Sequence, residues 1–491
     1  MVFTLRTDSD VPRYLQIVQG LREQIASGVL PAGARLPSSR QLALDLGVSR
    51  ITVANAYAEL EADGIIEARA GSGTFVLPPR IRDAAPAAPD DVVEVPVWQE
   101  RFEHRVMGAR ERMLGQALRS YGPNDRMSFA WGAGDMRLFP AVQFRRILAE
   151  VLRIDEGVAL GPESPRGFLP LRETLSTYLR QQGIEVAAAD VLITAGTQQA
   201  INLVAQTLLR QGDRVVVEAP TWPGALDVFE GLGAEIIGIP LDADGMRADA
   251  LQRALEREHP RLIFTTPTFQ NPTGIAMSAT RRREIVALSH RHGVPILEDD
   301  NMRELRFGDP APPPLAAFDG YGDVIYAASF TKSLIPALRL GYVVARGPIQ
   351  EALAHQRRTL DMFGSTLLQR ALHRFLESGD IHAHWKHTRR VYRRRHAAML
   401  DALRRHFPAG MRWRGVEGGF VIWIEAPDRV PIMALLDDAQ RQGVGFAPGA
   451  AFFPQPADQP FMRLNFAALT EQQIEHGIET LGGLLHRHLC P

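Results

Sequence analysis

Ser329-Phe330-Thr331-Lys332, with Arg339 seven residues further on, is the stretch that decides the fold of most of this chain. Lys332 is one of only two lysines among 491 residues. General scarcity of lysine explains why lysines are rare, but it does not explain why one stands in this motif. A lysine amine can form a Schiff base with the aldehyde of pyridoxal phosphate, while hydroxyls and a guanidinium hold the phosphate. The stretch therefore predicts a pyridoxal phosphate site attached to Lys332, with Ser329, Thr331 and Arg339 around it.

Three segments upstream of Lys332 carry groups that fit the same cofactor. Thr197 stands where an apolar strand-like run gives way to a helix, so its hydroxyl and the local backbone amides can hold a phosphate. A capped helix without a ligand would have the same sequence. Trp222 follows another strand-like run and can stack on a pyridine ring, although a core position is the commoner fate of tryptophan. Asn271 offers a donor to the ring oxygen of the cofactor.

Two charged groups complete the predicted site. The run Glu298-Asp299-Asp300 ends a strand-like segment, and one carboxylate facing the pyridine nitrogen keeps that nitrogen protonated. Arg463 stands within an apolar run, where a buried arginine needs a partner. A substrate carboxylate is a good bidentate partner, and an internal salt bridge is the alternative.

The first part of the chain has a different pattern. Ser38 with Gln41 three residues later predicts the start of a helix that ends at Gly47, and Ser49 predicts the cap of the next helix. Two helices joined by so short a turn form a helix-turn-helix. Two short strand-like runs, 65–69 and 74–76, then predict a hairpin, or wing.

A helix-turn-helix can place its second helix in the DNA major groove, and arginine suits contacts with both phosphate and guanine. The residues expected at the DNA are Arg40, Ser49, Arg50, Thr52, Arg69, Gly71 and Gly73. Residues 1–80 hold eight arginines and eight acidic residues, so the segment lacks the usual net positive charge of a DNA-binding module. The positions of Arg40, Arg50 and Arg69 at the expected DNA-contact edge matter more for DNA binding than the net charge of the segment. A module used for protein contacts is the alternative.

Residues 78–97 are rich in proline and alanine and have no helical or strand period. That composition predicts a linker between an N-terminal domain, 1–77, and a larger domain, 98–491. A long loop inside a single domain is the alternative.

Both halves resemble known families. The runs Leu36-Pro37-Ser38-Ser39-Arg40 and Gly71-Ser72-Gly73-Thr74 are among the residues by which 12–76 resemble a GntR-type winged helix-turn-helix. Residues 98–491 resemble the fold type I aminotransferases, nearest to the 2-aminoadipate and kynurenine aminotransferases. The whole chain resembles the MocR/GabR-type transcriptional regulators. This implies a multi-domain protein: an N-terminal winged helix-turn-helix and an α/β PLP-dependent transferase domain of fold type I.

The resemblance also implies roles and partners. Lys332 would form the Schiff base and Asp299 would meet the pyridine nitrogen, while Asn271 would bind the ring oxygen and Trp222 would stack. Thr197, Gln198, Ser329 and Arg339 would hold the phosphate, and Arg463 an α-carboxylate. The implied protein is a homodimer that binds a double-stranded DNA operator and senses an amino acid, an amine or pyridoxal phosphate. A working aminotransferase acting on an amino acid is the alternative.

One departure from the aminotransferase pattern bears on that choice. The family usually has a tyrosine two or three residues after the pyridine-binding aspartate, where this chain has Asn301 and Met302. A phenol there tunes the pKa of the Schiff base. Its replacement favours sensing over efficient amino transfer.

The remaining features exclude other classes. The net charge is −1, the single cysteine is Cys490, and no run reaches the ~20 apolar residues of a membrane span. We therefore expect a cytoplasmic protein without a secretory signal, a disulfide framework or a membrane partner. Histidines 382, 384 and 387 do not share one helix face, so we expect a solvated helix and no metal site. The arginine-rich run 389–395 predicts a solvated face, with an auxiliary DNA contact as the alternative.

Overall fold

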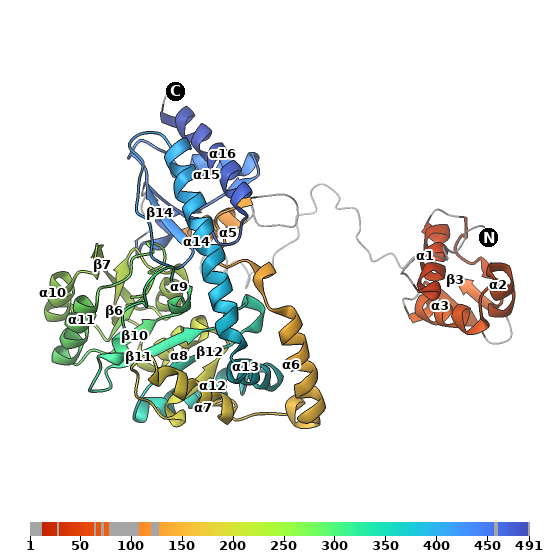
Figure 1. Ribbon diagram of the computed structural model, residues 1–491, viewed down its shortest axis with the longest axis horizontal. Coiled ribbons are helices and arrows are strands. Elements are labelled where there is room, and N and C mark those ends of the chain that lie inside the picture. Colours follow the sequence, from red (N-terminus) through yellow and green to blue (C-terminus); the bar gives the residue numbers. More distant parts are fainter. Residues whose placement is uncertain are drawn as a thin grey trace, which may run out of the picture. The chain divides into compact units, whose positions relative to one another are not determined.

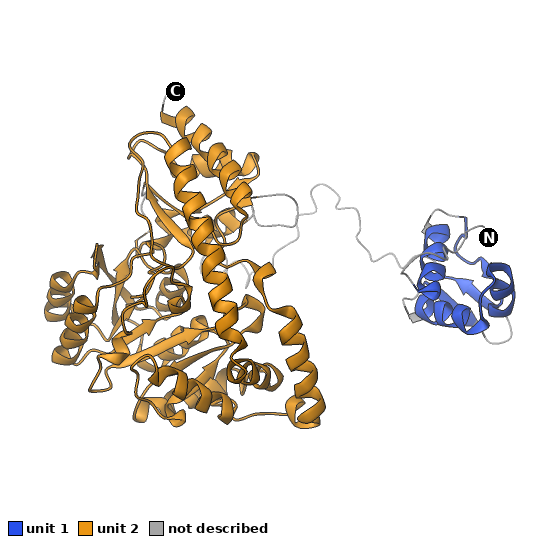
Figure 2. Ribbon diagram, in the orientation of Figure 1, with its two compact units in different colours: residues 1–99 blue, residues 100–491 orange. Residues whose placement is uncertain are grey.

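The computed structural model describes residues 12–26, 29–62, 65–69, 73–77, 108–118, 127–455 and 460–489. The chain divides into two compact units, Met1–Gln99 and Glu100–Pro491 (Figure 2), which are treated separately below. The predicted linker 78–97, Gly71 and Cys490 lie outside the described residues. None of the helices described has the length and apolar character needed to cross a bilayer.

The described residues of the first unit form three helices and a small antiparallel sheet of order β1-β3-β2. Its elements are α1 (Arg13–Ala26), β1 (Arg35–Leu36), α2 (Ser39–Leu46), α3 (Arg50–Ala62), β2 (Ile66–Arg69) and β3 (Gly73–Val76). The three helices enclose a core that includes Leu21, Leu42 and Val53. This arrangement confirms the predicted winged helix-turn-helix fold.

Side-chain caps set the helix starts in this unit. The Ser38 hydroxyl accepts a hydrogen bond from the Gln41 backbone N–H at 3.2 Å, which is one half of the predicted capping box. The Gln41 side chain instead donates to Asp45 at 2.8 Å. The Tyr57 hydroxyl donates to the Pro37 carbonyl at 2.8 Å and so ties α3 to the segment that leads into α2.

An eight-stranded sheet forms the centre of the second unit (Figure 1), in the order β5-β12-β11-β10-β9-β6-β7-β8. The strands are β5 (Val191–Thr194), β6 (Arg214–Ala219), β7 (Glu235–Asp242), β8 (Gly245–Met246), β9 (Leu262–Thr265), β10 (Ile296–Asp299), β11 (Val324–Ser329) and β12 (Gly341–Val344). They run parallel apart from β12 and the edge strand β8. Both faces are covered: Val215 and Val217 of β6 enter one apolar cluster and Val216 enters another.

Helices cover both faces of this sheet. The helices of the sheet region are α6 (Ala141–Ile154), α7 (Leu169–Arg180), α8 (Thr197–Leu208), α9 (Pro223–Gly231), α10 (Ala248–Glu258), α11 (Ala279–His292), α12 (Pro348–Asp361) and α13 (Thr366–Glu377). Residues of α8, α9 and α12 share one cluster, and residues of α10 and α11 share the other. A doubly covered, mostly parallel sheet confirms the predicted α/β class.

The C-terminal part adds a four-stranded antiparallel sheet, β13-β14-β17-β16, packed against long helices. Its elements are α14 (Asp380–His406), β13 (Arg412–Trp413), β14 (Val421–Glu425), α15 (Ile432–Arg441), β15 (Val444–Gly445), β16 (Ala447–Pro448), β17 (Phe461–Asn465) and α16 (Glu471–Leu489). Earlier in the chain, α5 (Ala109–Leu118) is attached through buried Arg110, which binds Glu230 at 2.6 Å. Short β4 (Met127–Ser128) pairs with β15.

Candidate functional site

The carboxyl ends of three strands of the eight-stranded sheet place the predicted cofactor residues together. β10 ends at Asp299, β11 ends at Ser329, and the turn after β5 leads into α8 at Thr197. In open α/β sheets, ligands bind in the crevice outside these strand ends. A cavity of about 310 Å³ lies there. Its lining consists of Gly196, Thr197, Gln198, Trp222, Gly224, Thr266, Asn271, Asp299, Asn301, Met302, Ser329, Thr331, Lys332 and Arg339. Every residue predicted to bind the cofactor is among them.

Lys332 lies in this cavity with its amine directed at the backbone. The Lys332 Nζ donates a hydrogen bond to the Gly132 carbonyl oxygen. Burial, together with the positive charges of Arg463 and Arg339, lowers the pKa of Lys332 to about 8, and the carboxylate of Asp299 opposes this shift. A lowered pKa leaves more of the amine neutral near pH 7, which is the form that attacks an aldehyde.

Asp299 is the one carboxylate of its run that lines the cavity. Glu298 accepts hydrogen bonds from the Leu315 and Ala316 backbone N–H groups at 2.8 and 3.0 Å, and Asp300 binds Arg303. Burial raises the pKa of Asp299 to about 7, while a hydrogen bond from Asn301 lowers it. The Asn301 Nδ2 donates to both carboxylate oxygens of Asp299, at 2.9 and 3.2 Å. Asn301 thus takes part in the site by fixing this carboxylate, a contact that the sequence pattern did not indicate.

A second corner of the cavity suits a phosphate. Gly196 has a φ of +116°, and a Cβ there would lie 3.4 Å from Thr331 Oγ1 and 3.5 Å from an Arg339 nitrogen. Thr331 Oγ1 is buried and has no hydrogen-bond partner among the described residues. Buried polar atoms are rarely left unpaired, so this donor and the nearby guanidinium fit an anion seated at the start of α8.

Gln198 holds a neighbouring ring with its side chain. The Trp222 Nε1 donates to the Gln198 Oε1 at 3.0 Å, and the Gln198 Nε2 donates to the Gly224 carbonyl at 2.6 Å. The side chain is thereby committed to orienting Trp222. The Gln198 backbone N–H remains in the first turn of α8, where an anion would meet it.

Arg463 is 3% exposed and binds only neutral groups. Its Nη1 donates to Asn271 Oδ1 at 3.0 Å and its Nη2 to the Ala130 carbonyl at 2.6 Å. Its Nε is buried and unpaired, and none of the described residues forms an ion pair with it. The internal salt bridge considered from the sequence is therefore absent from the described part of the chain. Burial lowers the pKa of Arg463 to about 10.

Arg463 and Lys332 both approach the backbone of Gly132. A Cβ on Gly132 would stand 3.7 Å from both terminal nitrogens of Arg463, and the Gly132 carbonyl accepts from Lys332. A molecule that reaches the Lys332 amine is thus close to a guanidinium with unused N–H donors.

Of the residues predicted to meet DNA, Arg40 lies in α2, and Ser49, Arg50 and Thr52 lie at the start of α3. Arg40 and Arg50 are exposed. The Ser49 hydroxyl accepts from the Thr52 backbone N–H at 3.2 Å and lies 2.8 Å from the Thr52 hydroxyl, so these two groups cap the helix. Ile51, which the sequence analysis passed over, is 72% exposed beside Arg50. An exposed apolar side chain at a helix N-terminus can contact a thymine methyl group.

The wing is described only in part. Gly73 has a φ of +114°, and a Cβ there would lie 2.7 Å from the Arg35 Nε, so the position requires glycine. Gly71 lies outside the described residues, and so does the side chain of Arg69.

Two sequence expectations about α14 are wrong. His384 is not solvated: it is buried, and its Nε2 lies 3.0 Å from the Ser333 carbonyl oxygen. Arg395 is not on a solvated face either, because it is buried and binds Asp135 at 2.8 Å. Both errors have one cause: one face of α14 packs against the rest of the unit. No cluster of three metal-binding side chains occurs among the described residues.

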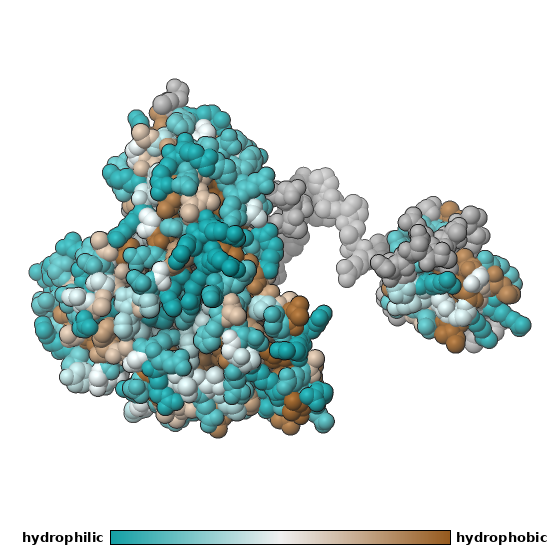
Figure 3. Space-filling model, viewed as in Figure 1, coloured by the Kyte–Doolittle hydropathy of each residue, from teal (hydrophilic) through white to brown (hydrophobic). Residues whose placement is uncertain are grey.

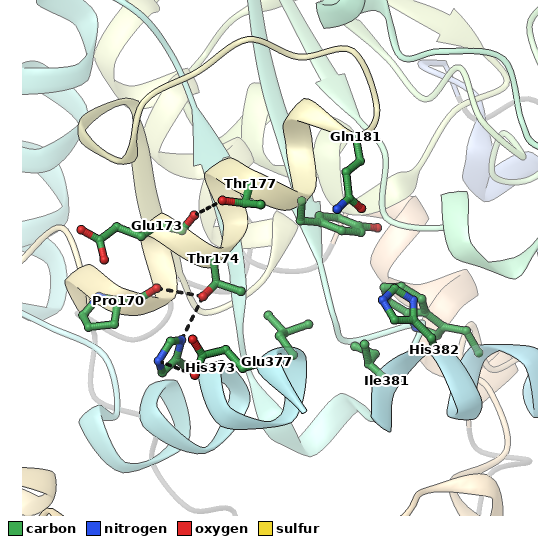
Figure 4. A pocket seen from close by; sticks show the side chains of 12 residues that line it. Pro170, Glu173, Thr174, Thr177, Gln181, His373, Glu377, Ile381 and His382 are labelled. Atoms are coloured by element: carbon green, nitrogen blue, oxygen red, sulfur yellow. Dashed lines mark hydrogen bonds and ion pairs between the residues drawn. The ribbon is translucent and has the colours of Figure 1, made fainter. Parts of the chain in front are cut away.

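A larger groove of about 490 Å³ lies between α7, α13 and α14 (Figure 4). There the Thr174 hydroxyl donates to the Pro170 carbonyl at 3.0 Å and lies 3.0 Å from His373 Nδ1. The groove has acidic side chains, Glu173 and Glu377, and neither lysine nor arginine in its lining. It therefore lacks the amine and the cations that a phosphorylated aldehyde requires, and the Lys332 cavity is the better candidate for the cofactor site.

Comparison with known proteins agrees with both units. Residues 13–76 match the family of bacterial regulatory proteins, gntR family, and residues 128–481 match aminotransferase class I and II. The HTH-type transcriptional regulator YdfD of Bacillus subtilis is 32% identical over 96% of this chain and 96% of its own length. The rhizopine catabolism regulatory protein MocR of Rhizobium meliloti, whose role is described as probable, is 31% identical over 98% of this chain and 95% of its own.

Solved structures resemble the second unit. LysN, the α-aminoadipate aminotransferase of Thermus thermophilus, complexed with N-(5'-phosphopyridoxyl)-L-leucine, is 33% identical with a TM-score of 0.74. The match covers 80% of this chain and 99% of that one. The Pyrococcus horikoshii kynurenine aminotransferase is 32% identical with a TM-score of 0.75, over the same shares.

Proposed function

Because the chain belongs to the MocR-type regulators of the GntR family, which use pyridoxal phosphate, we propose that it senses an amino acid or amine at the Lys332 site and thereby regulates transcription. The single observation that carries the effector class is buried Arg463, which binds only neutral acceptors. A buried charge without a counter-charge is costly, and an effector carboxylate would supply that counter-charge in bidentate form.

Different residues of the chain are proposed to hold different parts of the cofactor. When bound, pyridoxal phosphate supplies an aldehyde that condenses reversibly with amines. Lys332 would be the attachment point, and Asp299, which Asn301 holds by hydrogen bonds, would pair with the pyridine nitrogen. Trp222 would stack on the ring, and Asn271 would donate to its oxygen. Thr197, Ser329, Thr331 and Arg339 would hold the phosphate together with the backbone N–H of Gln198.

The second candidate function is amino transfer. Its support is that Lys332, Asp299 and Arg463 all stand in positions suited to it. Against it, Asn301 and Met302 occupy the places where the resembled enzymes usually carry a tyrosine, and Met302 is 2% exposed and has no proton to exchange. We therefore rank sensing first.

The partners follow from the two units. Arg40, Arg50 and Thr52 are proposed to contact a double-stranded operator, and residues 78–97 to tether the units. A DNA partner implies a cytoplasmic protein. A homodimer is proposed from a run of exposed apolar side chains on the second unit, over α6 and the turns beside it (Figure 3), because such patches mark interfaces. Those in α6 or the turns beside it are Met136, Val142, Leu152, Ile154, Val158 and Leu160; Leu169, Leu360, Met362 and Phe363 are further exposed apolar side chains of the unit.

The experiment treats the cofactor-loaded protein with borohydride and locates the adduct by mass spectrometry, in parallel with a DNA-shift assay and a ketoacid assay. An adduct on Lys332, a shifted operator and little ketoacid are expected. An adduct on Lys386 would refute the site, and sustained ketoacid production without a DNA shift would favour the enzyme.

A further inference from the structure

A groove of about 490 Å³ on the second unit has four arginines and one lysine among its nine lining residues. It lies between α14 and the turn that follows η4 (Arg303–Leu305). Its charged or imidazole-bearing lining residues are Arg306, Lys386, His387, Arg389, Arg390 and Arg393. No carboxylate lines it. The whole chain has a net charge of −1, so this concentration of positive charge is local and is not a general excess.

Most of these charges are not neutralised within the described part of the unit. Among the described residues, Glu304 is the one carboxylate that forms ion pairs with arginines of the groove lining. Its carboxylate binds Arg389 at 2.6 Å and lies 3.7 Å from Arg306. Arg390 and Arg393 contact only uncharged acceptors, the His387 ring and the Phe307 carbonyl. None of the described residues forms an ion pair with Lys386, Arg390 or Arg393, and all three side chains are exposed.

The spacing of these cations fits a polyanion better than a small anion. Lys386, Arg390 and Arg393 follow one another at four and three residues along a rigid helix, so they recur on one face over roughly 10 Å. Each strand of a duplex carries one phosphate per ~3.4 Å of helix axis, so a 10 Å length of axis holds about three phosphates of one strand. A single small anion would need donors that converge on one point.

An anionic membrane would present similar charges, but it also calls for apolar anchors. None of the groove's lining residues is an exposed large hydrophobic residue. The face of the unit over α14 is accordingly hydrophilic (Figure 3). The lining favours nucleic acid over lipid.

We propose that this groove is a second DNA contact, at which the aminotransferase-like unit binds the phosphate backbone of duplex DNA without reading its sequence. The contact is separate from the one proposed for α3, and it would hold DNA even where the first unit does not. Phosphate contacts position a protein on DNA and make its affinity depend on salt.

The test uses the full cofactor-loaded chain and a random-sequence 60-base-pair duplex. Lys386 is the only lysine besides Lys332, so acetylation of Lys386, read by mass spectrometry, reports directly on the groove. We expect the duplex to protect Lys386, in the native chain and equally in Arg50→Ala. Protection that disappears in Arg50→Ala would refute an independent contact in the groove, while the α3 contact would stand.

Charge removal gives the second readout. Lys386→Gln/Arg390→Gln/Arg393→Gln should reduce the slope of log affinity against log salt by roughly 2 to 3, because each lost phosphate contact removes about 0.9. The matched control, Arg253→Gln/Arg257→Gln/Arg291→Gln, removes the same charge from exposed helix surfaces elsewhere. Both triple variants should bind pyridoxal phosphate normally, which verifies folding. Equal slopes in the two variants, or protection of Lys386 by phosphatidylglycerol vesicles but not by duplex, would overturn the proposal.

Discussion

Replacing Arg463 by methionine should abolish the preference of the site for amino acids over simple amines. Methionine keeps an unbranched apolar stem of similar length and removes the guanidinium. Two of the five N–H groups of Arg463 donate to Asn271 and Ala130, which leaves three for an effector carboxylate. A hydrogen bond to a charged group contributes about 1.5–3 kcal/mol. Two such bonds at the lower limit give about 3 kcal/mol, or roughly a 150-fold loss of affinity.

The assay compares an amino acid with the amine that lacks only its carboxylate, such as L-leucine and 3-methylbutylamine. Each is titrated into the cofactor-loaded protein while the cofactor absorbance is followed. Arg463→Met should weaken the amino acid by roughly 150-fold and leave the amine within about threefold. Borohydride fixation on Lys332 checks that the variant still holds its cofactor. An equal loss for both ligands would refute the reasoning, because the arginine would then be supporting the fold and not binding a carboxylate.

Three further predictions concern the cofactor and the DNA. Burial lowers the pKa of Lys332 to about 8, so the amine is mostly neutral above pH ~8. The rate at which pyridoxal phosphate attaches to the cofactor-free protein should therefore rise with pH and level off above pH ~8. Stopped-flow rates that still increase toward pH 10, as for an exposed lysine, would contradict this prediction. Asn301→Leu removes a hydrogen bond that favours the ionised form of Asp299, so the pKa of Asp299 should rise. The low-pH limit below which the protein loses its cofactor should then move to higher pH in equilibrium titrations. An unchanged limit would show that Asn301 does not act through this carboxylate. Arg50→Ala should lose about 1–3 kcal/mol of operator affinity and relax specificity at one base pair, while cofactor binding persists. Unchanged operator affinity in a DNA-shift assay would show that Arg50 does not lie in the DNA major groove.

The sequence predicted those features of the structure that depend on residues close together in the chain. Lys332 with its hydroxyl neighbours, and the caps at Ser38 and Ser49, depend on residues only a few positions away. The caps at Ser38 and Ser49 form as the sequence predicted, and Lys332 lines one cavity with Ser329 and Thr331. Gly196, where a Cβ would lie 3.4 Å from Thr331 Oγ1, directly precedes Thr197 at the predicted helix start.

Contacts between distant segments could not be predicted in this way. The acceptors of Arg463 lie 192 and 333 residues away in the chain, and only the folded structure distinguishes neutral acceptors from a salt bridge. The side chain of Gln198 accepts a hydrogen bond from Trp222, 24 residues away, and the sequence did not indicate this contact. His384 looked solvated because helix periodicity identifies a buried face only when its residues are apolar.

The central claim is that the cofactor site and the DNA-binding unit are energetically coupled. Coupling is reciprocal, so a ligand that changes operator affinity must have its own affinity changed by operator DNA by the same factor. The direct measurement titrates an effector into the cofactor-loaded protein with and without operator DNA selected from random duplexes. We expect affinities that differ at least tenfold, about 1.4 kcal/mol, with the same factor recovered when DNA is titrated against effector. Identical affinities in both titrations, for a compound that regulates transcription in cells, would contradict the account.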